Sequence, residues 1–296
     1  MLCSKCRRQA VLYQRYSGLH LCKAHFIADF EAKAKRAIRT HRWIVPQDRI
    51  AVALSGGKNS SALLYFMQKL VGKRRDITLR AITIDEGIGG CHDSRVAAGI
   101  AESVGTELIV ASFQELCGVT MEEVAGAQGD CPSCSLCDVL RRRCLNRVAK
   151  EHGISSLALG FNLDDEAQTV LMKVLRGDGD RLFMPDDPAD GLVPWIRPFL
   201  TIPEREVALY AYLHGEGFEI GRCPYSKITL RSDVHAVLDD YDWRHPSTKY
   251  ALVNLGERLA SCRGLSDLAA SRCPICGGPC LGECRSCGMG KEVPDA

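Results

Sequence analysis

The sequence predicts an α/β protein built on a parallel sheet, with a helical extension and a small zinc-binding module at each terminus. Between residues 44 and 200, short apolar runs alternate with segments of helical periodicity. Residues 49–61 have the pattern of a strand, a glycine turn and a helix start, and cysteine pairs stand near both ends. We expect four units: residues 1–30 (N-terminal zinc module), 31–200 (α/β core), 201–268 (helical extension) and 269–296 (C-terminal zinc ribbon).

The composition is that of a soluble globular protein. The chain of 296 residues has 25% charged and 46% hydrophobic residues, with a formal net charge of +2. A nucleic-acid partner is therefore not signalled by the total charge and must be argued from local patches. No apolar run reaches the roughly 20 residues that cross a bilayer, and the first residues do not form a signal peptide. We expect a cytoplasmic protein without membrane contact.

Cysteine is the unusual residue, with 16 copies in the chain. At CxxC spacing and without a signal sequence, cysteines favour metal binding over disulfides. The N-terminal set has the spacing of a closed, structural zinc site: Cys3, Cys6, Cys22 and His25. A redox CxxC beside an unrelated Cys and His is the alternative. Two further pairs among glycines predict a zinc ribbon, with Cys280 left over: Cys273, Cys276, Cys284 and Cys287.

Residues 26–43 predict an amphipathic helix with a strongly basic surface, which includes Lys33, Arg36 and Arg39. Such a face is either simply solvated or lies along an RNA backbone.

Residues 49–70 predict a phosphate site. Residues 49–54 suit a buried strand, and residues 61–70 carry apolar side chains at helical spacing. In the turn between them, glycines admit close approach of a ligand, while free N–H groups and the helix dipole attract anions. An ordinary strand–turn–helix is the alternative. The expected contacts are Ser55, Gly56, Gly57, Lys58, Asn59 and Ser60.

Three more strands are expected at residues 77–84, 107–111 and 156–160, with helices at 94–104 and 162–176. This alternation predicts a parallel sheet covered by helices on both faces, with ligands at the carboxyl ends of the strands. Three of these ends are polar or glycine-rich and should converge on one pocket: residues 55–60, 84–87 and 160–165.

The last of these ends carries three acidic residues in a row, Asp164, Asp165 and Glu166. Helix capping and dipole complementarity account for one or two of them. Because they follow a strand end beside the expected phosphate site, we assign at least one to Mg²⁺ binding or base chemistry.

A second group of cysteines lies between the third and fourth strands. Cys131, Cys134 and Cys137 recur at three-residue spacing, and the nearest candidate partner is Cys223. A CxxC pair with a distant Cys suits a [4Fe-4S] cluster that has one iron open to a non-protein ligand. A third zinc site and a redox or persulfide-carrying pair are the alternatives. Arginines on the following helix form a solvated face or contact phosphate: Arg141, Arg142, Arg143 and Arg147.

Residues 201–260 predict three helices, at 203–214, 229–241 and 248–259, that carry Cys223 to the pocket. The remaining cysteines are expected to be buried and unliganded: Cys91, Cys117, Cys144 and Cys262.

The motif Ser-Gly-Gly-x-x-Ser after a strand resembles the PP-loop of the ATP pyrophosphatases. Together with the central CxxC, the distant Cys223 and zinc modules at both ends, it makes almost the whole chain resemble the tRNA 2-thiouridine synthetases of the TtuA type. The related tRNA cytidine thiolases share the core and the cluster but lack the two zinc modules.

The resemblance implies that ATP binds at the PP-loop, with Ile84, Gly160 and Asp165 completing the nucleotide site. The uridine C2 oxygen is adenylated with loss of pyrophosphate, and a sulfide on the cluster then displaces AMP. The implied cluster ligands are Cys134, Cys137 and Cys223. The implied catalytic residues are Asp164 or Asp165, which assists adenylation or coordinates Mg²⁺, and Arg141. Two Zn²⁺ complete the cofactors. The implied partners are tRNA and a sulfur donor (a ubiquitin-like thiocarboxylate carrier or inorganic sulfide), and the implied assembly is a homodimer.

Three positions depart from the family pattern. Asn59 stands where Asp is common, Phe161 stands where His is usual, and Cys131 adds a thiol that could close the cluster as a fourth ligand. Two other classes therefore stay open. One is another PP-loop ligase, forming an amide or lysidine, that needs no central cysteines. The other is a tRNA-binding paralogue without activity.

Overall fold

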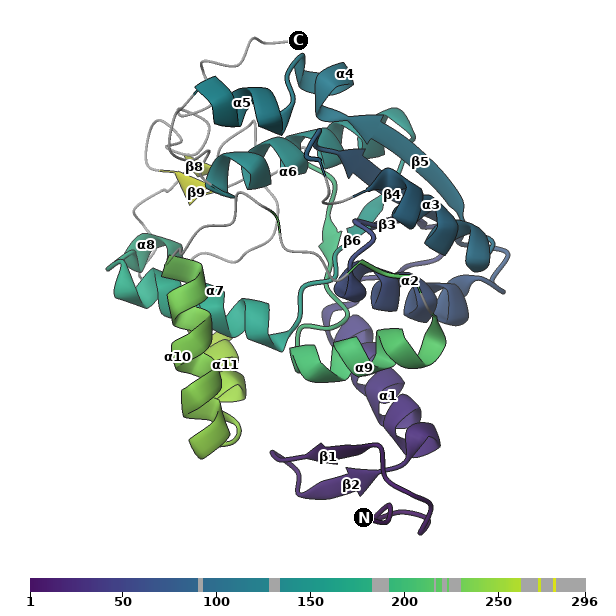
Figure 1. The fold of residues 1–296 in the computed structure, drawn as a ribbon, viewed down its shortest axis with the longest axis vertical. Coiled ribbons are helices and arrows are strands. Elements are labelled where there is room, and N and C mark those ends of the chain that lie inside the picture. Colours follow the sequence, from purple (N-terminus) through teal and green to yellow (C-terminus); the bar gives the residue numbers. More distant parts are fainter. Residues whose placement is uncertain are drawn as a thin grey trace.

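A computed structural model describes residues 1–89, 93–127, 134–182, 192–215, 217–219, 223, 230–261, 271–272 and 279–280. Its centre is a five-stranded sheet in the order β5-β4-β3-β6-β7, and every neighbouring pair is parallel. Figure 1 shows this sheet with helices on both sides. The strands are β3 (Arg49–Ala53), β4 (Thr78–Asp85), β5 (Glu107–Ser112), β6 (Ser156–Ala158) and β7 (Trp195–Ile196).

Two apolar layers bury the faces of the sheet because successive strand side chains point to opposite sides. Ile50 and Val52 of β3 belong to one core cluster, and Ala51 between them belongs to the other. The first cluster packs under α1 (Lys23–His41), α2 (Lys58–Val71), α3 (Ser94–Ser103) and α9 (Glu204–His214). The second packs under α4 (Phe113–Cys117), α5 (Met121–Ala127) and α6 (Cys134–Glu151).

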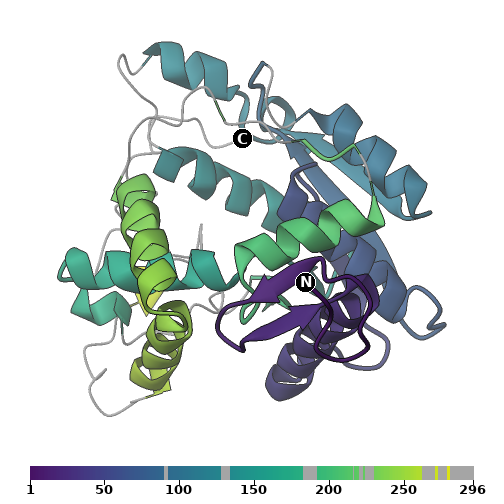
Figure 2. The ribbon, with the colours of Figure 1, turned by 60° about the horizontal axis from the view of Figure 1, so that its bottom comes forward.

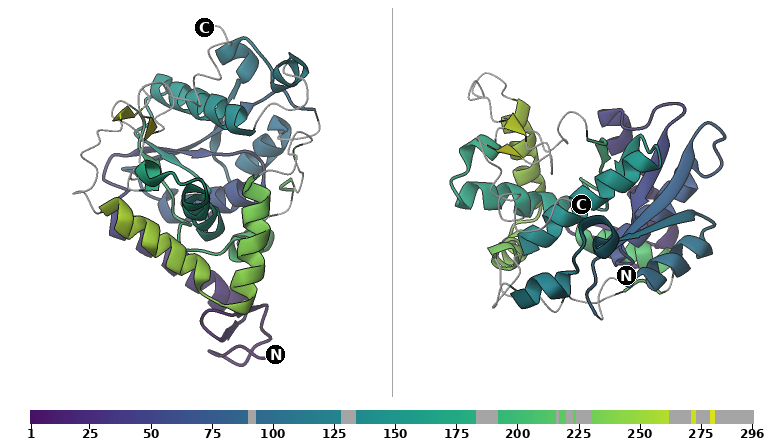
Figure 3. Two further views of the ribbon diagram at one scale, coloured as in Figure 1. Left: turned by 90° about the vertical axis from the view of Figure 1, so that its left-hand side faces the viewer. Right: turned by 90° about the horizontal axis from the view of Figure 1, so that it is seen from above.

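A third group of helices lies to one side of the sheet, as Figure 3 shows from above. Leu163 and Ala167 form a small apolar core with Val234, Leu238 and Val253. The helices of this group are α7 (Leu163–Leu175), α8 (Gly179–Leu182), α10 (Leu230–Arg244) and α11 (Thr248–Ser261). The extension is thus built onto the helix that carries the acidic residues.

The N-terminal module is a hairpin of β1 (Leu12–Gln14) and β2 (Leu19–Leu21), which leads directly into α1. Because α1 runs from the module into the core, it spans the expected boundary between residues 30 and 31. Figure 2 shows the hairpin in front of α9. Glu206 of α9, fully buried, accepts hydrogen bonds from Tyr16 Oη at 2.6 Å and Lys33 Nζ at 3.2 Å. This buried network ties the module to the core.

The sequence predicts most of these elements well: the strands at β3, β4, β5 and β6 and the helices α1, α2, α3, α7, α9, α10 and α11 all lie where expected. It does not predict β7, which is only two residues long. At the C-terminus, β8 (Ser271–Arg272) pairs antiparallel with β9 (Pro279–Cys280). Among the described residues, no helix combines the length and the apolar character of a membrane span.

Candidate functional site

The candidate site lies where the strand order reverses, between β3 and β6. The connections from β3 run outward to β4 and β5, and those from β6 run the other way to β7. Loops at the carboxyl ends of such strands diverge and leave a crevice for a ligand. The three polar strand ends predicted to converge follow β3, β4 and β6, which are neighbours in the sheet. The strand ends therefore lie side by side, as the sequence predicts, and their convergence on one pocket stays a prediction.

The loop after β3 is organised by its own hydroxyl groups. Ser60 Oγ donates to the Gly57 carbonyl at 3.0 Å and accepts from Ser55 N at 3.2 Å. Gly56 has φ +80°, a conformation that favours glycine. Gly57 at the N-cap of α2 carries no side chain, so no cap hydrogen bond competes with a ligand for the first amide N–H groups. A helix start in this form binds anionic phosphate.

Gly160, just after β6, meets this loop directly. A Cβ at this position would lie 3.0 Å from the carbonyl carbon and oxygen of Asn59 and 3.2 Å from Ser60 N. Only glycine allows the two strand ends to approach this closely. The Asn59 side chain leaves one polar atom open here, because its Oδ1 is buried and has no hydrogen-bond partner among the described residues. A bound nucleotide or its Mg²⁺ would satisfy this oxygen.

Two contacts connect the loop to the helical extension. Lys58 Nζ lies 2.6 Å from Glu204 Oε1 at the start of α9. Glu219 N donates to the Gly56 carbonyl at 2.8 Å, so that residues 217–219 run beside the loop as an added strand bridge. Lys58 therefore has a carboxylate partner that a phosphate would replace or share.

The two neighbouring aspartates of α7 have different surroundings. Asp164 is buried and both of its oxygens are used: Oδ1 accepts from Lys249 Nζ, and Oδ2 accepts from Glu204 N at 2.7 Å. Lys249, itself buried, also pairs with Asp239 of α10. Asp164 thus joins α7 to the start of α9 and to both helices of the extension.

Asp165 is half-buried and forms a capping box with Asn162. Its Oδ2 accepts a hydrogen bond from the backbone N–H of Asn162 at 3.1 Å. Burial raises the pKa of its carboxyl group to about 6; the Asn162 N–H and the Arg231 guanidinium oppose this shift, and the charges of Glu204 and Asp164 add to it. A carboxylate with a pKa near neutrality can exchange a proton under working conditions. The capping role predicted for this acidic run is thus present at Asp165, and its role in the chemistry stays a prediction.

Two of the central cysteines lie against the second apolar cluster, which packs under α6. Cys137 of α6 and Cys223 both pack against the second apolar cluster. Burial, followed by the negative charges of Glu86 and Cys223, raises the pKa of the Cys137 thiol to about 12, and the Arg141 guanidinium opposes this. Two of the three expected ligands are therefore close enough to interact, and soft thiolates in apolar surroundings suit an iron–sulfur cluster. The Cys134 side chain and Cys131 lie outside the described residues.

The arginines expected to contact phosphate have partners within the protein. Arg141 Nε donates to Glu86, and Arg141 Nη2 lies 3.4 Å from Cys137 Sγ. Arg142 pairs with Asp138 at 2.9 Å, and Arg147 pairs with Glu151 at 3.0 Å. Arg141 thus lies at the pair Cys137 and Cys223, which we call the cysteine centre. Of the spare cysteines, Cys117 and Cys144 contact each other with Sγ atoms 3.5 Å apart; Cys91 and Cys262 lie outside the described residues.

The predicted N-terminal zinc set is brought together. The metal-binding atoms of Cys3, Cys6, Cys22 and His25 all lie within 4.8 Å of one another. Cys6 Sγ lies 3.6 Å from Cys22 Sγ, near the edge of about 3.8 Å expected for a tetrahedron with Zn–S bonds of about 2.3 Å. Burial opposes ionisation of Cys3, but backbone N–H groups and His25 outweigh it and lower the pKa of this thiol to about 6. The C-terminal ligands Cys273, Cys276, Cys284 and Cys287 lie outside the described residues.

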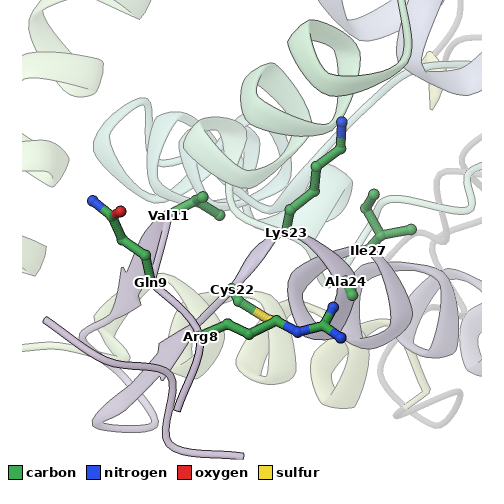
Figure 4. Close-up of a pocket in the computed structure, with 7 residues that line it drawn as sticks. All are labelled: Arg8, Gln9, Val11, Cys22, Lys23, Ala24 and Ile27. Atoms are coloured by element: carbon green, nitrogen blue, oxygen red, sulfur yellow. The ribbon is translucent and has the colours of Figure 1, made fainter. Parts of the chain in front are cut away.

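An open cavity of about 530 Å³ lies beside this zinc set rather than at the PP-loop. Its wall is apolar at Val11, Ala24 and Ile27 and carries Arg8, Gln9 and Lys23 (Figure 4). Strand topology and glycine contacts, rather than cavity volume, therefore locate the candidate active site.

Sequence reasoning gave no individual role to three residues that organise the site, although one of them, Glu86, lies in a strand end predicted to reach it. Glu86 stands directly after β4, so a polar residue at a strand end was a usable signal. Glu204 and Lys249 reach Lys58 and Asp164 from helices far along the chain, and no local pattern marks them.

Comparison with known proteins agrees with this geometry. The PP-loop domain family matches residues 27–222, and the N-terminal LIM domain family of 2-thiouridine synthetase TtuA matches residues 2–27. The tRNA 2-thiolation protein NcsA of Haloferax volcanii is 34% identical, covering 99% of both chains. The tRNA-5-methyluridine(54) 2-sulfurtransferase of Pyrococcus horikoshii is 29% identical, covering 99% of this chain and 96% of its own.

A solved structure gives the same result in three dimensions. The U34-tRNA thiolase NcsA from Methanococcus maripaludis, solved with its [4Fe-4S] cluster, superposes with a TM-score of 0.84 at 33% identity. The match covers 99% of this chain and 96% of that one. The PP-loop, the cysteine centre and the N-terminal Cys/His set therefore have one explanation: the chain belongs to the NcsA/TtuA-type family of PP-loop tRNA 2-thiolation proteins.

Proposed function

We propose that the protein is an ATP-dependent tRNA uridine 2-sulfurtransferase that adenylates the C2 oxygen of a uridine and replaces it with sulfur. The oxygen of a uracil carbonyl is a poor leaving group, and transfer of the AMP group of ATP to this oxygen makes it a good one, because it then departs as part of AMP. The uridine oxygen attacks the α-phosphorus of ATP, pyrophosphate leaves, and AMP departs when sulfur adds at C2.

The residues of the first step follow from the loop geometry. The amide N–H groups at the start of α2 and the Ser55 and Ser60 hydroxyls bind the phosphates. Lys58 moves from Glu204 toward the pyrophosphate. Asn59 Oδ1 accepts a hydrogen bond from the bound nucleotide or coordinates its Mg²⁺. Ile84 and Gly160 border the nucleoside, since both stand at the carboxyl ends of strands that flank β3.

Asp164 and Asp165 divide the acidic roles. Asp165, whose pKa is about 6, serves as proton acceptor or Mg²⁺ ligand. Asp164 fixes α9 and α11 through Glu204 N and Lys249 Nζ, which sets the direction of the helix that presents Asp165. Loss of either would reduce adenylation, but only loss of Asp164 would also loosen the extension.

The cysteine centre would be held by Cys134, Cys137 and Cys223. When bound there, a [4Fe-4S] cluster supplies sulfur through the iron that no cysteine ligates. The protein keeps this position in an apolar surrounding, because Cys137 and Cys223 both pack against the second core cluster. Cys3, Cys6, Cys22 and His25 would hold one structural Zn²⁺, and the C-terminal cysteines a second.

One observation carries this proposal: the same short segment touches the PP-loop and brings Cys223 to Cys137. Glu219 N donates to Gly56, and Cys223 follows four residues later. Four residues span at most about 14 Å, so Cys223 lies within about that distance of the segment that contacts the PP-loop. A PP-loop ligase without sulfur chemistry would not need this arrangement.

We further propose a homodimer that accepts sulfur from a thiocarboxylated carrier or from inorganic sulfide.

The test is a thiolation assay on anaerobically reconstituted protein with unmodified tRNA, ATP and sulfide. Mass spectrometry of digested tRNA should show 2-thiouridine together with one AMP released per thiolation. Cys223→Ala should lose the cluster and the product, whereas Cys144→Ala, a matched change on α6, should keep the iron. Turnover of ATP without 2-thiouridine by iron-loaded wild-type protein would overturn the proposal.

A further inference from the structure

A buried carboxylate, Glu86, lies against the cysteine centre and has no role in the mechanism above. It follows β4 directly and is 2% exposed. One of its oxygens accepts from Arg141 Nε, and the other lies 3.7 Å from Cys137 Sγ. Since Arg141 Nη2 is also 3.4 Å from Cys137 Sγ, the three side chains contact one another in a closed triangle.

The charges of this triangle require explanation. A buried carboxylate costs free energy unless it is paired, and a second anion nearby raises that cost. Cys137 becomes such an anion when it ligates iron, because metal-bound cysteine is a thiolate. Its S–H then no longer donates to Glu86. Arg141 is left as the cation between two anions, with Nε on the carboxylate and Nη2 on the sulfur.

The backbone holds Glu86 firmly in place. Its carbonyl accepts from Met121 N, at the start of α5, at 2.9 Å. Gly87, the next residue, has φ +67° and donates its N–H to Asp85 Oδ1 at 2.9 Å. Cys137 and Arg141 are four residues apart on α6 and therefore share one helix face. A rigid sheet edge thus fixes the guanidinium relative to the cysteine ligand.

We propose that Glu86 is a positioning residue: it holds the Arg141 guanidinium against Cys137 Sγ, and the Glu86–Arg141 pair balances the charge beside the cluster. This inference rests on the proposed function in that it requires a cluster at Cys137. Hydrogen bonds and charges next to ligating sulfur set the reduction potential and the stability of iron–sulfur clusters. Arg141 then acts on the cluster ligand as well as on any substrate charge.

The experiment measures the cluster itself rather than turnover. Wild-type and variant proteins are reconstituted anaerobically, and the midpoint potential is determined by spectroelectrochemical titration. Iron retention is followed against a chelator. Glu86→Gln keeps the shape but removes the negative charge, so the potential should shift to more positive values. Arg141→Gln should shift it to more negative values and release iron roughly tenfold faster or more.

The double variant Glu86→Gln/Arg141→Gln restores charge balance, and its potential should return toward that of wild type. Arg142→Gln, a loss of the same charge at the next residue of α6, is the matched control and should leave the potential unchanged. Arg141→Lys keeps the charge but cannot contact both partners at once, so its iron release should still be faster than wild type.

The outcomes separate the inference from the proposed function. If Glu86→Gln and Arg141→Gln keep the wild-type potential and iron retention, the inference is wrong while the cluster assignment stands. If wild-type protein acquires no cluster on reconstitution, the proposed function fails and takes the inference with it. Should Glu86→Gln fail to fold by circular dichroism, Arg141→Lys decides the matter: unchanged iron release in that variant overturns the inference.

Discussion

Replacing Gly160 by Ala tests the closeness of the two strand ends at the nucleotide site. The new Cβ would lie 3.0 Å from backbone atoms of Asn59, whereas ordinary contacts begin near 3.4 Å. The backbone must therefore move by about 0.4 Å, and overpacking of this kind costs about 1–3 kcal/mol. Since Asn59 and Ser60 open α2, part of that movement turns the phosphate-binding N–H groups away from ATP.

We expect Gly160→Ala to lower the free energy of unfolding by about 1–3 kcal/mol and to weaken ATP binding roughly tenfold, which corresponds to about 1.4 kcal/mol. Urea unfolding and isothermal titration calorimetry with a non-hydrolysable ATP analogue measure the two effects. Gly99→Ala in α3 is the control, because no described atom outside that helix's own backbone lies within 4 Å of the Cβ that alanine would add. It should stabilise the helix by up to about 1 kcal/mol and leave ATP binding unchanged.

Wild-type ATP affinity and unchanged stability in Gly160→Ala would refute the reasoning. They would show that the loop has room at this point, and that the phosphate site is not defined by contact between the ends of β3 and β6.

Three further predictions concern single groups. Burial raises the pKa of Asp165 from 3.8 to about 6, so the folded protein loses stability as pH rises from 3.8 to about 6 and this carboxyl group ionises. Asp165→Asn should therefore be more stable than wild type at pH 7, by at most about 3 kcal/mol, while losing adenylation; chemical denaturation should show a smaller advantage of the variant at pH 5 than at pH 7, and a variant less stable than wild type at pH 7 would contradict the reasoning. Glu206→Gln removes the charge that Lys33 contacts in the buried network, which should cost about 1–3 kcal/mol in urea unfolding; an unchanged midpoint would mean that Asp29 alone satisfies Lys33. Cys22→Ser should lower the zinc content by one ion and expose residues 1–25 to proteolysis while ATP binding persists; a full zinc complement in that variant would exclude the site.

The sequence alone determined the local chemistry of this protein. The strand–glycine–helix pattern placed the PP-loop within a few residues, because glycines, hydroxyls and helix periodicity act over short stretches of chain. CxxC spacing likewise brought Cys3, Cys6, Cys22 and His25 into one predicted set, since tetrahedral coordination tolerates few spacings. The alternation of strands and helices predicted the parallel sheet, because the periodicity of each element is also local to a short stretch of chain.

Only the tertiary structure decided how the charged groups are paired. Asp164 and Asp165 are adjacent and chemically identical in sequence, yet Asp164 is held by Lys249, 85 residues away, and Asp165 keeps a raised pKa near the loop. Glu86 likewise meets Arg141 across 55 residues, and Glu206 meets Tyr16 across 190. Such pairings follow from which elements pack together, and burial strengthens them because low-dielectric surroundings penalise any charge left without a partner.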